Sequence, residues 1–247
     1  MKSHDSSAAR FYVEAVAVGR VELTGDEAHH AAHVLRLREG AEVQLFDGRG
    51  GRAAARLIEV KKGRVTADVL HIEPPARRPR PRVHLGFAVP KGKRLDWLLE
   101  KATELGAASL RPVVFERSVA GGDELSEGKL ARWSGHCIAA AKQCRLDFLP
   151  EILPHQTLAE HLREACDGPR LMGDGGGGVE AIGAALARCT AEELRLLVGP
   201  EGDFTDAEKR AAVEAGWQPV RLGVTTLRVE TAAVALLAAV VALSERR

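Results

Sequence analysis

Cysteine is scarce in this chain, and the placement of its cysteines argues against two kinds of site. The 247 residues contain only Cys137, Cys144, Cys166 and Cys189, each without CxxC spacing and without paired histidines. A disulfide framework or a zinc site is therefore not expected. Isolated thiols suit a reducing compartment, so the sequence predicts a cytoplasmic protein with no bound metal.

A long hydrophobic run is also missing. The longest apolar stretch, residues 232–243, has twelve residues, well below the roughly 20 that span a bilayer. The first ten residues are polar and no apolar segment follows them, so no secretory signal is predicted. We expect no membrane partner, and we expect the apolar stretch to be a buried helix.

The chain as a whole has almost no net charge, but one segment of it is strongly basic. The formal net charge is +1, yet residues 75–94 carry seven basic residues and no acid. This basic belt lies between a neutral segment, 1–74, and an acidic remainder. Such a belt suits a polyanion better than a membrane, although charge alone leaves a solvated linker equally open.

Proline marks a boundary in the chain. Four prolines fall within residues 74–81, where they disfavour helix and keep the backbone extended. Before them, the pattern predicts strands at 11–18, 42–46, 53–60 and 64–72 and a short helix at 26–37. Short strands of this kind predict a small β-barrel. The predicted division is a barrel domain over 1–74, a proline- and arginine-rich linker over 75–82, and a second domain over 83–247.

The second domain alternates strands and helices. Strands are predicted at 83–89, 110–115, 170–172, 194–198 and 220–222, and helices at 95–105, 130–142, 179–187, 206–215 and 229–243. The helix at 206–215 follows a capping box that begins at Thr205, and Gly216 ends it. This alternation predicts an α/β domain with a mostly parallel sheet covered on both faces.

Two loops of this domain follow predicted strands, where open parallel sheets bind ligands. The first is Gly199-Pro200-Glu201-Gly202, whose glycines let a ligand approach the backbone, although an ordinary turn stays open. The second places Arg228, Glu230 and Thr231 directly before the apolar helix. A helix of that composition is expected to be buried, so charged groups at its start need partners.

Two other patterns suggest different sites. Residues 173–178 satisfy GxGxxG after a short strand, as in nicotinamide dehydrogenases, but no clear βαβ unit with a ribose-binding acid follows. The histidines at 29, 30 and 33 suggest a metal, but only Asp26 and Glu27 accompany them. For the histidines we favour a helix that faces solvent or a polyanion.

The two loops together resemble the cofactor-binding motifs of the RsmE family of RNA methyltransferases. The motifs are GPEG at 199–202 and LGxxxLRxETA at 222–232. Other segments match in the same order: RFYV at 10–13, HAAHVLR at 30–36, LFDG at 45–48, KG at 91–92 with EKATELG at 100–106, ERS at 116–118 and PEI at 150–152. The resemblance therefore extends over most of the chain.

The resemblance implies a SPOUT-type α/β domain with a deep trefoil knot, following an N-terminal PUA-like β-barrel domain. It implies S-adenosylmethionine as the cofactor, a homodimer, and methylation at N3 of a uridine in the decoding region of 16S ribosomal RNA within the small subunit. The cofactor-binding residues that it implies are Leu171, Met172, Gly173, Val198, Gly199, Pro200, Glu201, Gly202, Leu222, Gly223, Thr226, Leu227, Arg228, Thr231 and Ala232.

Methylation of uridine N3 requires alignment of the reactants and removal of the N3 proton. We expect Arg228 to stabilise charge on the uracil oxygens, and Glu201 or Glu230 to accept the proton. Phosphate contacts are expected from Arg10, Arg36, Arg38, Arg77, Arg78, Arg80, Arg82, Lys91, Lys93 and Arg94.

Four positions depart from the family pattern, one of them Lys142, which stands where the family has an acid. Asp203 stands where the family usually has the last glycine of GPEGG, and Thr225 stands where it commonly has arginine. Leu146 stands where the family's EQxGR segment ends in arginine. A non-catalytic RNA-binding protein of the same fold remains open on these departures.

Overall fold

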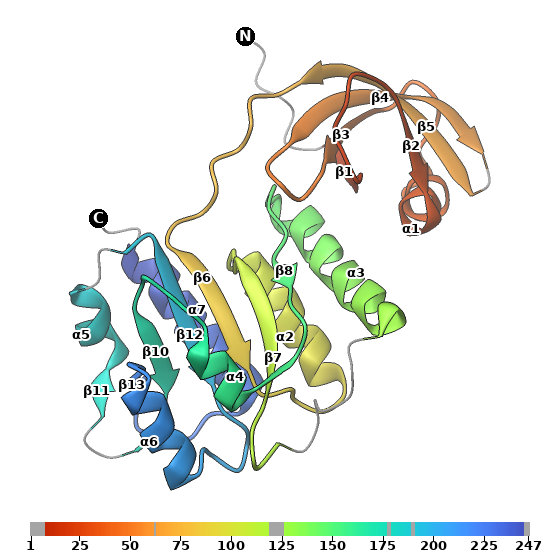
Figure 1. Ribbon diagram of the computed structural model, residues 1–247. Helices are drawn as coiled ribbons and strands as arrows, with labels where there is room; N and C mark the ends of the chain where they lie inside the picture. The colour runs from red at the N-terminus through yellow and green to blue at the C-terminus, as the bar shows by residue number, and fades with distance from the viewer. Residues whose placement is uncertain (1–7, 62, 119–125, 177–178, 189–190, 245–247) are drawn as a thin grey trace. The chain divides into compact units, whose positions relative to one another are not determined.

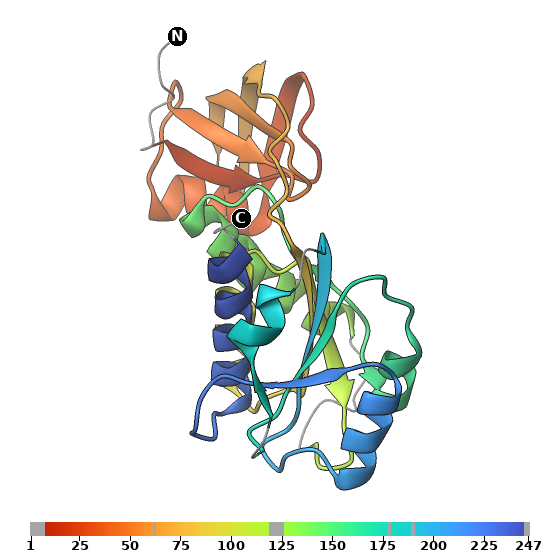
Figure 2. The same cartoon turned by 90° about the vertical axis from the view of Figure 1, so that its left-hand side faces the viewer.

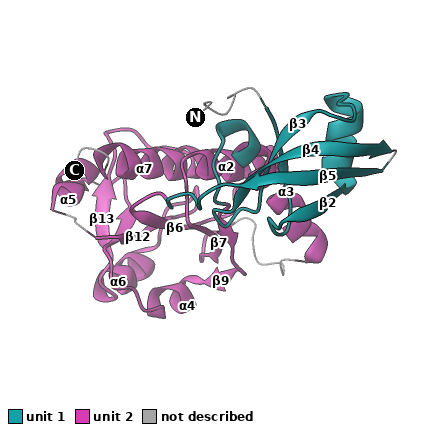
Figure 3. Ribbon diagram, turned by 90° about the horizontal axis from the view of Figure 1, so that it is seen from above, with its two compact units in different colours: residues 1–78, 141–148 teal, residues 79–140, 149–247 magenta. Residues whose placement is uncertain are grey.

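The computed structural model describes residues 8–61, 63–118, 126–176, 179–188 and 191–244. The chain divides into two compact units (Figure 3). The first unit comprises residues 1–78 and 141–148, and the second comprises 79–140 and 149–247.

The first unit is a curled five-stranded sheet with two short helical segments. Its strands are β1 (Ala9–Tyr12), β2 (Gly19–Thr24), β3 (Glu42–Phe46), β4 (Arg52–Lys61) and β5 (Arg64–Ile72), in the order β1-β3-β4-β5-β2. The β1/β3 pair is parallel and the other pairs are antiparallel. Phe11, Leu45 and Leu57 are buried in its core. The sheet agrees with the predicted small barrel, but β2 was not predicted.

The predicted helix at 26–37 is shorter than expected and changes type. It consists of α1 (Gly25–His29) followed by a π-helical turn, η1 (His30–Val34). Arg36 then adopts a left-handed backbone with φ of 53°, which cannot continue a right-handed helix. Val34 and Leu35 are left exposed by this ending.

Residues 141–148 lie apart in sequence from the rest of the first unit but belong to it. The Arg10 side chain, 3% exposed, forms an ion pair with Asp147, and Arg52 Nη1 lies 3.3 Å from the same carboxylate. The Gly50 amide donates to the Asp147 carbonyl at 3.0 Å. The sequence-based division placed 141–148 in the second domain. It did not assign them to the first, because the contacts that hold them there join residues nearly a hundred positions or more apart.

The second unit is a mostly parallel sheet between two layers of helices (Figures 1 and 2). Its strands are β6 (Arg82–Phe87), β7 (Ser109–Val114), β8 (Glu151–Ile152), β9 (Gln156–Thr157), β10 (Arg170–Gly173), β11 (Glu180–Ala181), β12 (Glu193–Val198) and β13 (Gln218–Arg221). The main order is β11-β13-β10-β12-β6-β7-β8, and every recorded pair in it is parallel.

The helices of this unit are α2 (Lys93–Glu104), α3 (Glu127–Cys144, of which 141–144 belong to the first unit), α4 (Leu158–Arg163), α5 (Ile182–Ala187), α6 (Asp206–Glu214) and α7 (Val229–Ser244). Helices α2 and α7 pack together on one face of the sheet, with α4 and α6 on the other (Figure 1). Leu236 and Leu237 of α7 are buried in the core with Leu98 and Leu99 of α2.

Helix α7 is less covered than its composition predicts. Its core side is buried, but Val234, Ala235, Ala238 and Val241 are only partly buried and Ala242 is exposed. These five residues lie on one helical face, because they are spaced at one, four, seven and eight positions. The chain therefore presents an apolar helix face, which we name the α7 outer face.

Candidate active site

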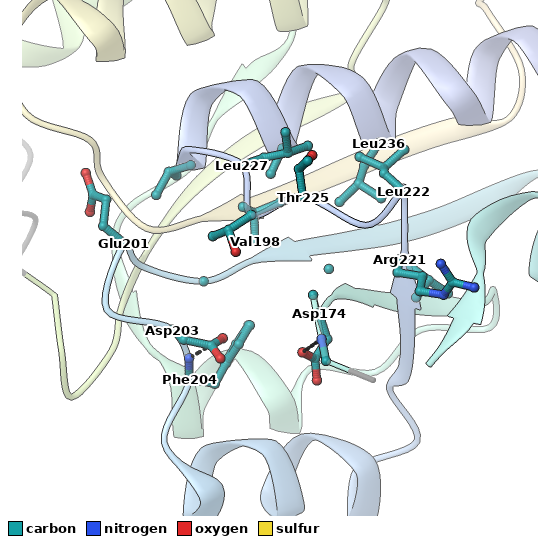
Figure 4. A pocket seen from close by; sticks show the side chains of 18 of the residues that line it. Asp174, Val198, Glu201, Asp203, Phe204, Arg221, Leu222, Thr225, Leu227 and Leu236 are labelled. Carbon is teal, nitrogen blue, oxygen red and sulfur yellow. Dashed lines mark hydrogen bonds between the residues drawn. The ribbon is translucent and has the colours of Figure 1, made fainter. Parts of the chain in front are cut away.

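A cavity of about 350 Å³ lies at the carboxyl ends of β10, β12 and β13 (Figure 4). It is lined by residues 173–176 after β10, by 198–201, 203 and 204 after β12, and by most of 220–229 after β13, and α7 adds Ala232 and Leu236. Three strand ends of a parallel sheet converge here, which is where such sheets bind ligands. Both loops that the sequence predicted as ligand-binding sites line this cavity.

The loop after β12 is packed so tightly that glycine is required at its start. A Cβ atom at Gly199 would lie 2.6 Å from the ring of Phe204. That ring is buried and meets Phe115 edge to face, with centroids 5.3 Å apart. The loop therefore follows the surface of Phe204 closely, and its backbone is held at the cavity wall.

The ERS segment supports the same loop from outside. Arg117 Nη1 donates to the Gly202 carbonyl at 2.8 Å, and the Glu116 amide donates to Glu208 Oε1 at 2.8 Å. Ser118 Oγ accepts the Phe115 amide at 2.8 Å. These contacts give a positioning role to a segment that the sequence matched without assigning one.

The loop after β10 is tied to the neighbouring strand and to itself. The Asp174 amide donates to the Val220 carbonyl at 2.9 Å, and Asp174 Oδ1 accepts the Gly176 amide at 2.9 Å. A Cβ atom at Gly173 would lie 2.9 Å from Leu236 Cδ1, so the backbone approaches α7 closely there. The cavity thus has one wall made of glycine-rich backbone.

The loop after β13 is the most exposed of the three. Val224 is 96% exposed and Leu222 is 37% exposed, although both are apolar. Arg221, at the end of β13, lines the cavity and donates from Nε to the Val179 carbonyl at 2.8 Å. Helix α7 begins directly after the loop, with the Ala232 amide donating to the Arg228 carbonyl at 2.8 Å.

Comparison with known proteins assigns both units. A family described as RNA methyltransferase domain matches residues 77–241, and one described as RNA methyltransferase PUA domain matches residues 23–70. The ribosomal RNA small subunit methyltransferase E of Mycobacterium tuberculosis is 36% identical and covers 96% of this chain and 92% of its own. This chain belongs to the RsmE family. The Bacillus subtilis protein of that name is 28% identical over 88% of both chains.

Solved RsmE-like structures share the whole architecture. The ribosomal RNA small subunit methyltransferase E of Neisseria gonorrhoeae bound to S-adenosyl methionine has a TM-score of 0.85 and 31% identity, covering 96% of this chain and 98% of its own. A putative Legionella pneumophila methyltransferase in complex with the same cofactor has a TM-score of 0.86 and 29% identity over 95% and 97%. The predicted family and fold class are confirmed.

Most residues that the RsmE resemblance implied for the cofactor come together at the cavity. Those that line it are Gly173, Val198, Gly199, Pro200, Glu201, Leu222, Gly223, Thr226, Leu227 and Ala232. The others, Leu171, Met172, Gly202, Arg228 and Thr231, do not line it. Leu171 and Met172 are buried within β10, where side chains pack the sheet core.

The structure adds lining residues that sequence reasoning missed. These include Asp174, Asp203, Phe204, Arg221 and Leu236. Asp174 follows β10 within the segment that had been weighed as a dinucleotide motif, and Gly177 and Gly178 of that motif lie outside the described residues. Membership of the RsmE family replaces the dehydrogenase interpretation of this segment.

The three predicted catalytic residues lie in different environments. Glu201 is exposed at the cavity, with its Oε1 3.5 Å from Arg94 Nη1. Glu230 is 7% exposed in the first turn of α7, and its Oε2 has no hydrogen-bond partner among the described residues. Arg228 is exposed beside the cavity without lining it. Of the three, only Glu201 lines the cavity.

Arg10 must be removed from the predicted RNA contacts. Its side chain is 3% exposed, forms the ion pair with Asp147, and lies 4.2 Å from the centre of the Phe46 ring. Burial lowers the pKa of Arg10 while Asp147 raises it, so the pair is a structural one. An RNA phosphate cannot reach a guanidinium that is covered in this way.

Part of the predicted basic belt also has intramolecular partners. Arg78 lies over the Phe148 ring at 4.6 Å, Arg80 pairs with Glu192, and Arg82 pairs with Glu193. The predicted contacts Arg36, Arg38, Arg77, Lys91 and Lys93 are exposed, and Arg94 pairs with Glu201. The belt therefore offers less unpaired charge than the sequence suggested.

The described residues contain no cluster of three or more histidine, cysteine or acidic side chains able to hold a metal ion. His29 and His33 stack with centroids 5.0 Å apart, whereas His30 Nδ1 lies 2.8 Å from Lys142 Nζ. Burial and Lys142 both lower the pKa of His30. Within the same residues, no helix is long and apolar enough to cross a bilayer.

Proposed function

We propose that this protein transfers a methyl group from S-adenosylmethionine to N3 of a uridine in the decoding region of 16S ribosomal RNA, within the small subunit, in the cytoplasm. The observation that carries the proposal is the cavity formed by three loops at the ends of β10, β12 and β13 in a chain of the RsmE family. RsmE-like structures from Neisseria gonorrhoeae and Legionella pneumophila are described as bound to this cofactor.

The residues present suit that cofactor. Apolar side chains of Val198, Phe204, Leu227 and Leu236 provide a wall for an adenine ring. Backbone at Gly173, Gly199 and Gly223 lines the cavity, and the missing glycine side chains let a ligand approach it closely. Acidic and basic side chains among the lining residues, such as Asp174 and Arg221, can meet hydroxyl, ammonium and carboxylate groups.

The bound cofactor supplies an electrophilic methyl group on a sulfonium, and the protein's residues prepare the acceptor. Uridine N3 carries a proton at neutral pH, so the site must remove it. We assign Glu201 or Glu230 as the acceptor of that proton, and Arg228 as the cation that stabilises charge on the uracil oxygens. Glu201 is the more accessible carboxylate, since it is exposed and lines the cavity whereas Glu230 is buried.

We assign RNA binding to the PUA-like domain, over residues 1–74, and to the linker, over 75–82, ahead of the methyltransferase domain at 83–247. Arg36, Arg38 and Arg77 are exposed and suited to phosphate contacts. Lys91 and Lys93 are also exposed, at the carboxyl end of β6. We also propose that the chain around β13 and α7 forms the deep trefoil knot implied by the family resemblance.

We propose a homodimer formed through the α7 outer face. That face is apolar and made of small side chains, which allow close helix approach, and the apolar Leu222 and Val224 are exposed just before α7. Exposed apolar side chains of this kind are typical of an association site. A second copy of this chain is the occupant we assign to it.

The decisive experiment is transfer of labelled methyl from S-adenosylmethionine to small ribosomal subunits that lack the modification, with the product mapped by mass spectrometry. Methylation at uridine N3 in the decoding region is expected. Cofactor binding without transfer to any subunit RNA would instead support the non-catalytic alternative, and methylation elsewhere would correct the target. Subunits that already carry the modification are the control and should accept no label.

A further inference from the structure

Lys209 of α6 joins two loops of the cavity. Its Nζ lies 3.2 Å from Asp174 Oδ1 and 3.0 Å from Asp203 Oδ2. Asp174 belongs to the loop after β10 and Asp203 to the loop after β12, and both line the cavity (Figure 4). One ammonium group therefore connects two walls that are otherwise separate stretches of chain.

Asp203 holds an unusual backbone conformation at this connection. Its φ of 61° lies in the left-handed region, which is uncommon for residues other than glycine but tolerated by aspartate. The Asp203 amide donates to the Pro200 carbonyl at 2.9 Å, and its Oδ1 accepts the Phe204 amide at 2.8 Å. The second carboxylate oxygen is the one that meets Lys209. The turn is thus held both by its own hydrogen bonds and by α6.

Asp174 is the buried end of the connection. Its side chain is 8% exposed, against 27% for Lys209 and 60% for Asp203. A carboxylate so little exposed needs partners, and here they are the Gly176 amide and Lys209. The Asp174 backbone in turn bonds to Val220 of β13, so the effect of Lys209 extends to the third strand end.

The charges around the cavity make the position of this lysine important. Asp174, Glu201 and Asp203 line the cavity, and Arg221 is the other lining residue with a full charge. Arg94 lies 3.5 Å from Glu201, while Lys209 is shared by the two aspartates. Removing the ammonium would leave like charges on two facing walls, and it would remove the hydrogen bonds that hold the walls together.

We propose that Lys209 is a positioning residue that sets the spacing of the loops after β10 and β12, and thereby the affinity of the cavity for its cofactor. The choice of S-adenosylmethionine as the ligand rests on the function proposed above. The effect of Lys209 on loop spacing does not depend on that function. Lys209 acts through Asp174 and Asp203 and is not itself a catalytic residue, since it does not line the cavity.

The test compares Lys209→Met, Lys209→Arg and Arg210→Met in the full chain. Arg210 is the matched control, because it is the next residue on α6 and is exposed. Calorimetric titration should show S-adenosylmethionine and its demethylated product both binding about tenfold more weakly to Lys209→Met, as expected for loss of a charge-assisted tie. Lys209→Arg should restore most of the affinity, and Arg210→Met should bind as the unaltered protein does. RNA affinity should be unchanged in all three.

Amide hydrogen exchange without cofactor provides a second, independent readout. Residues 173–176 and 199–204 should exchange faster in Lys209→Met and at the original rate in Arg210→Met.

Unchanged exchange in Lys209→Met would overturn the proposal whatever the cofactor proves to be. Unchanged affinity for both ligands would overturn it too. Tighter binding of the cationic ligand, with unchanged affinity for the demethylated product, would replace loop spacing with a purely electrostatic effect. If the unaltered protein bound neither ligand, the proposed function would fail, and the exchange rates would still decide the role of Lys209.

Discussion

At the scale of single residues, Arg10 and Asp147 form a buried ion pair in which each charge compensates the other. The guanidinium is 3% exposed and the carboxylate 10% exposed, and Arg52 is the second cation near that carboxylate. Removing one member of a buried pair leaves the other charge without compensation.

We therefore expect Arg10→Ala to lower the free energy of unfolding of the first unit by about 3 kcal/mol. Urea denaturation followed by circular dichroism measures this. Arg20→Ala, at an exposed position of β2, should change the stability by less than about 0.5 kcal/mol. A loss of under about 1 kcal/mol for Arg10→Ala would contradict the structural role assigned to the pair.

Arg228 provides a residue-scale test of the proposed chemistry. Its side chain is exposed and does not line the cavity, so cofactor binding should not depend on it. Arg228→Ala should lower kcat by about 100-fold, the size of effect seen when one charge-stabilising donor is removed. The Kd for S-adenosylmethionine should change less than about twofold. Single-turnover methyl transfer separates the two, and full turnover would remove Arg228 from the mechanism.

At the scale of elements, α4 sits on the sheet through a buried histidine. His161 is 5% exposed, stacks near Trp217 with centroids 5.5 Å apart, and occupies the space above Gly86, where a Cβ atom would lie 2.8 Å from its Nε2. Burial lowers the pKa of His161 to about 4, with the Arg195 and Arg111 charges lowering it further against Glu164. The ring is therefore neutral at pH 7.

The lowered pKa of His161 predicts that the folded protein loses stability in acid. Between pH 6.5 and 4 the unfolded chain binds a proton at His161 that the folded chain does not, so stability falls as the pH falls. The loss approaches about 3 kcal/mol near pH 4. His161→Phe should reduce the difference in unfolding free energy between pH 7 and pH 4.5, and His71→Phe, at an exposed position, should not. Equal pH dependence in all three proteins would contradict the effect.

Elements with strong local signals were predictable from sequence, and those fixed by distant contacts were not. The strands at Glu42–Phe46 and Arg64–Ile72 and the capped helix α6 follow their patterns closely. Helix α4 was missed because six residues are too few to show a helical period, although Thr157 and Glu160 form a capping box. The site loops were found because glycine and charge at strand ends are local features.

The ion-pair partners of charged residues could not be predicted from the sequence. Arg80 and Arg82 looked like RNA contacts because no acid lies near them in the sequence. Their partners, Glu192 and Glu193, lie more than a hundred residues away. Sequence composition counts charges but cannot pair them across a parallel sheet, where β12 lies beside β6.

At the scale of the whole molecule, this pairing changes the expected salt dependence of RNA binding. Each lost phosphate contact should reduce the slope of log affinity against log salt by about one unit. Arg36→Gln combined with Arg38→Gln should therefore reduce the slope by about two, measured by fluorescence anisotropy with a ribosomal RNA fragment. Arg80→Gln should change it by less than about half a unit, since that charge is already paired. Equal slopes for all variants would exclude Arg36 and Arg38 as phosphate contacts.

The association of two chains is tested on the α7 outer face. Ala238→Glu places a charge in the middle of this face and should convert a species of twice 26.5 kDa into one of 26.5 kDa in light scattering. Ala207→Glu, on the exposed start of α6, is the control and should keep the larger mass. A single-chain mass for the unaltered protein would refute the homodimer directly.

The discontinuous first unit has a consequence for how the protein is made. Its sheet is complete by residue 72, but the carboxylate that compensates Arg10 comes at residue 147. During translation Arg10 therefore lacks its Asp147 partner until about seventy more residues have been synthesised. The proline-rich segment looks like a natural place to divide the chain, yet a fragment ending there would lack Asp147. The nascent barrel is thus committed to its native form only after much of the neighbouring domain has been synthesised.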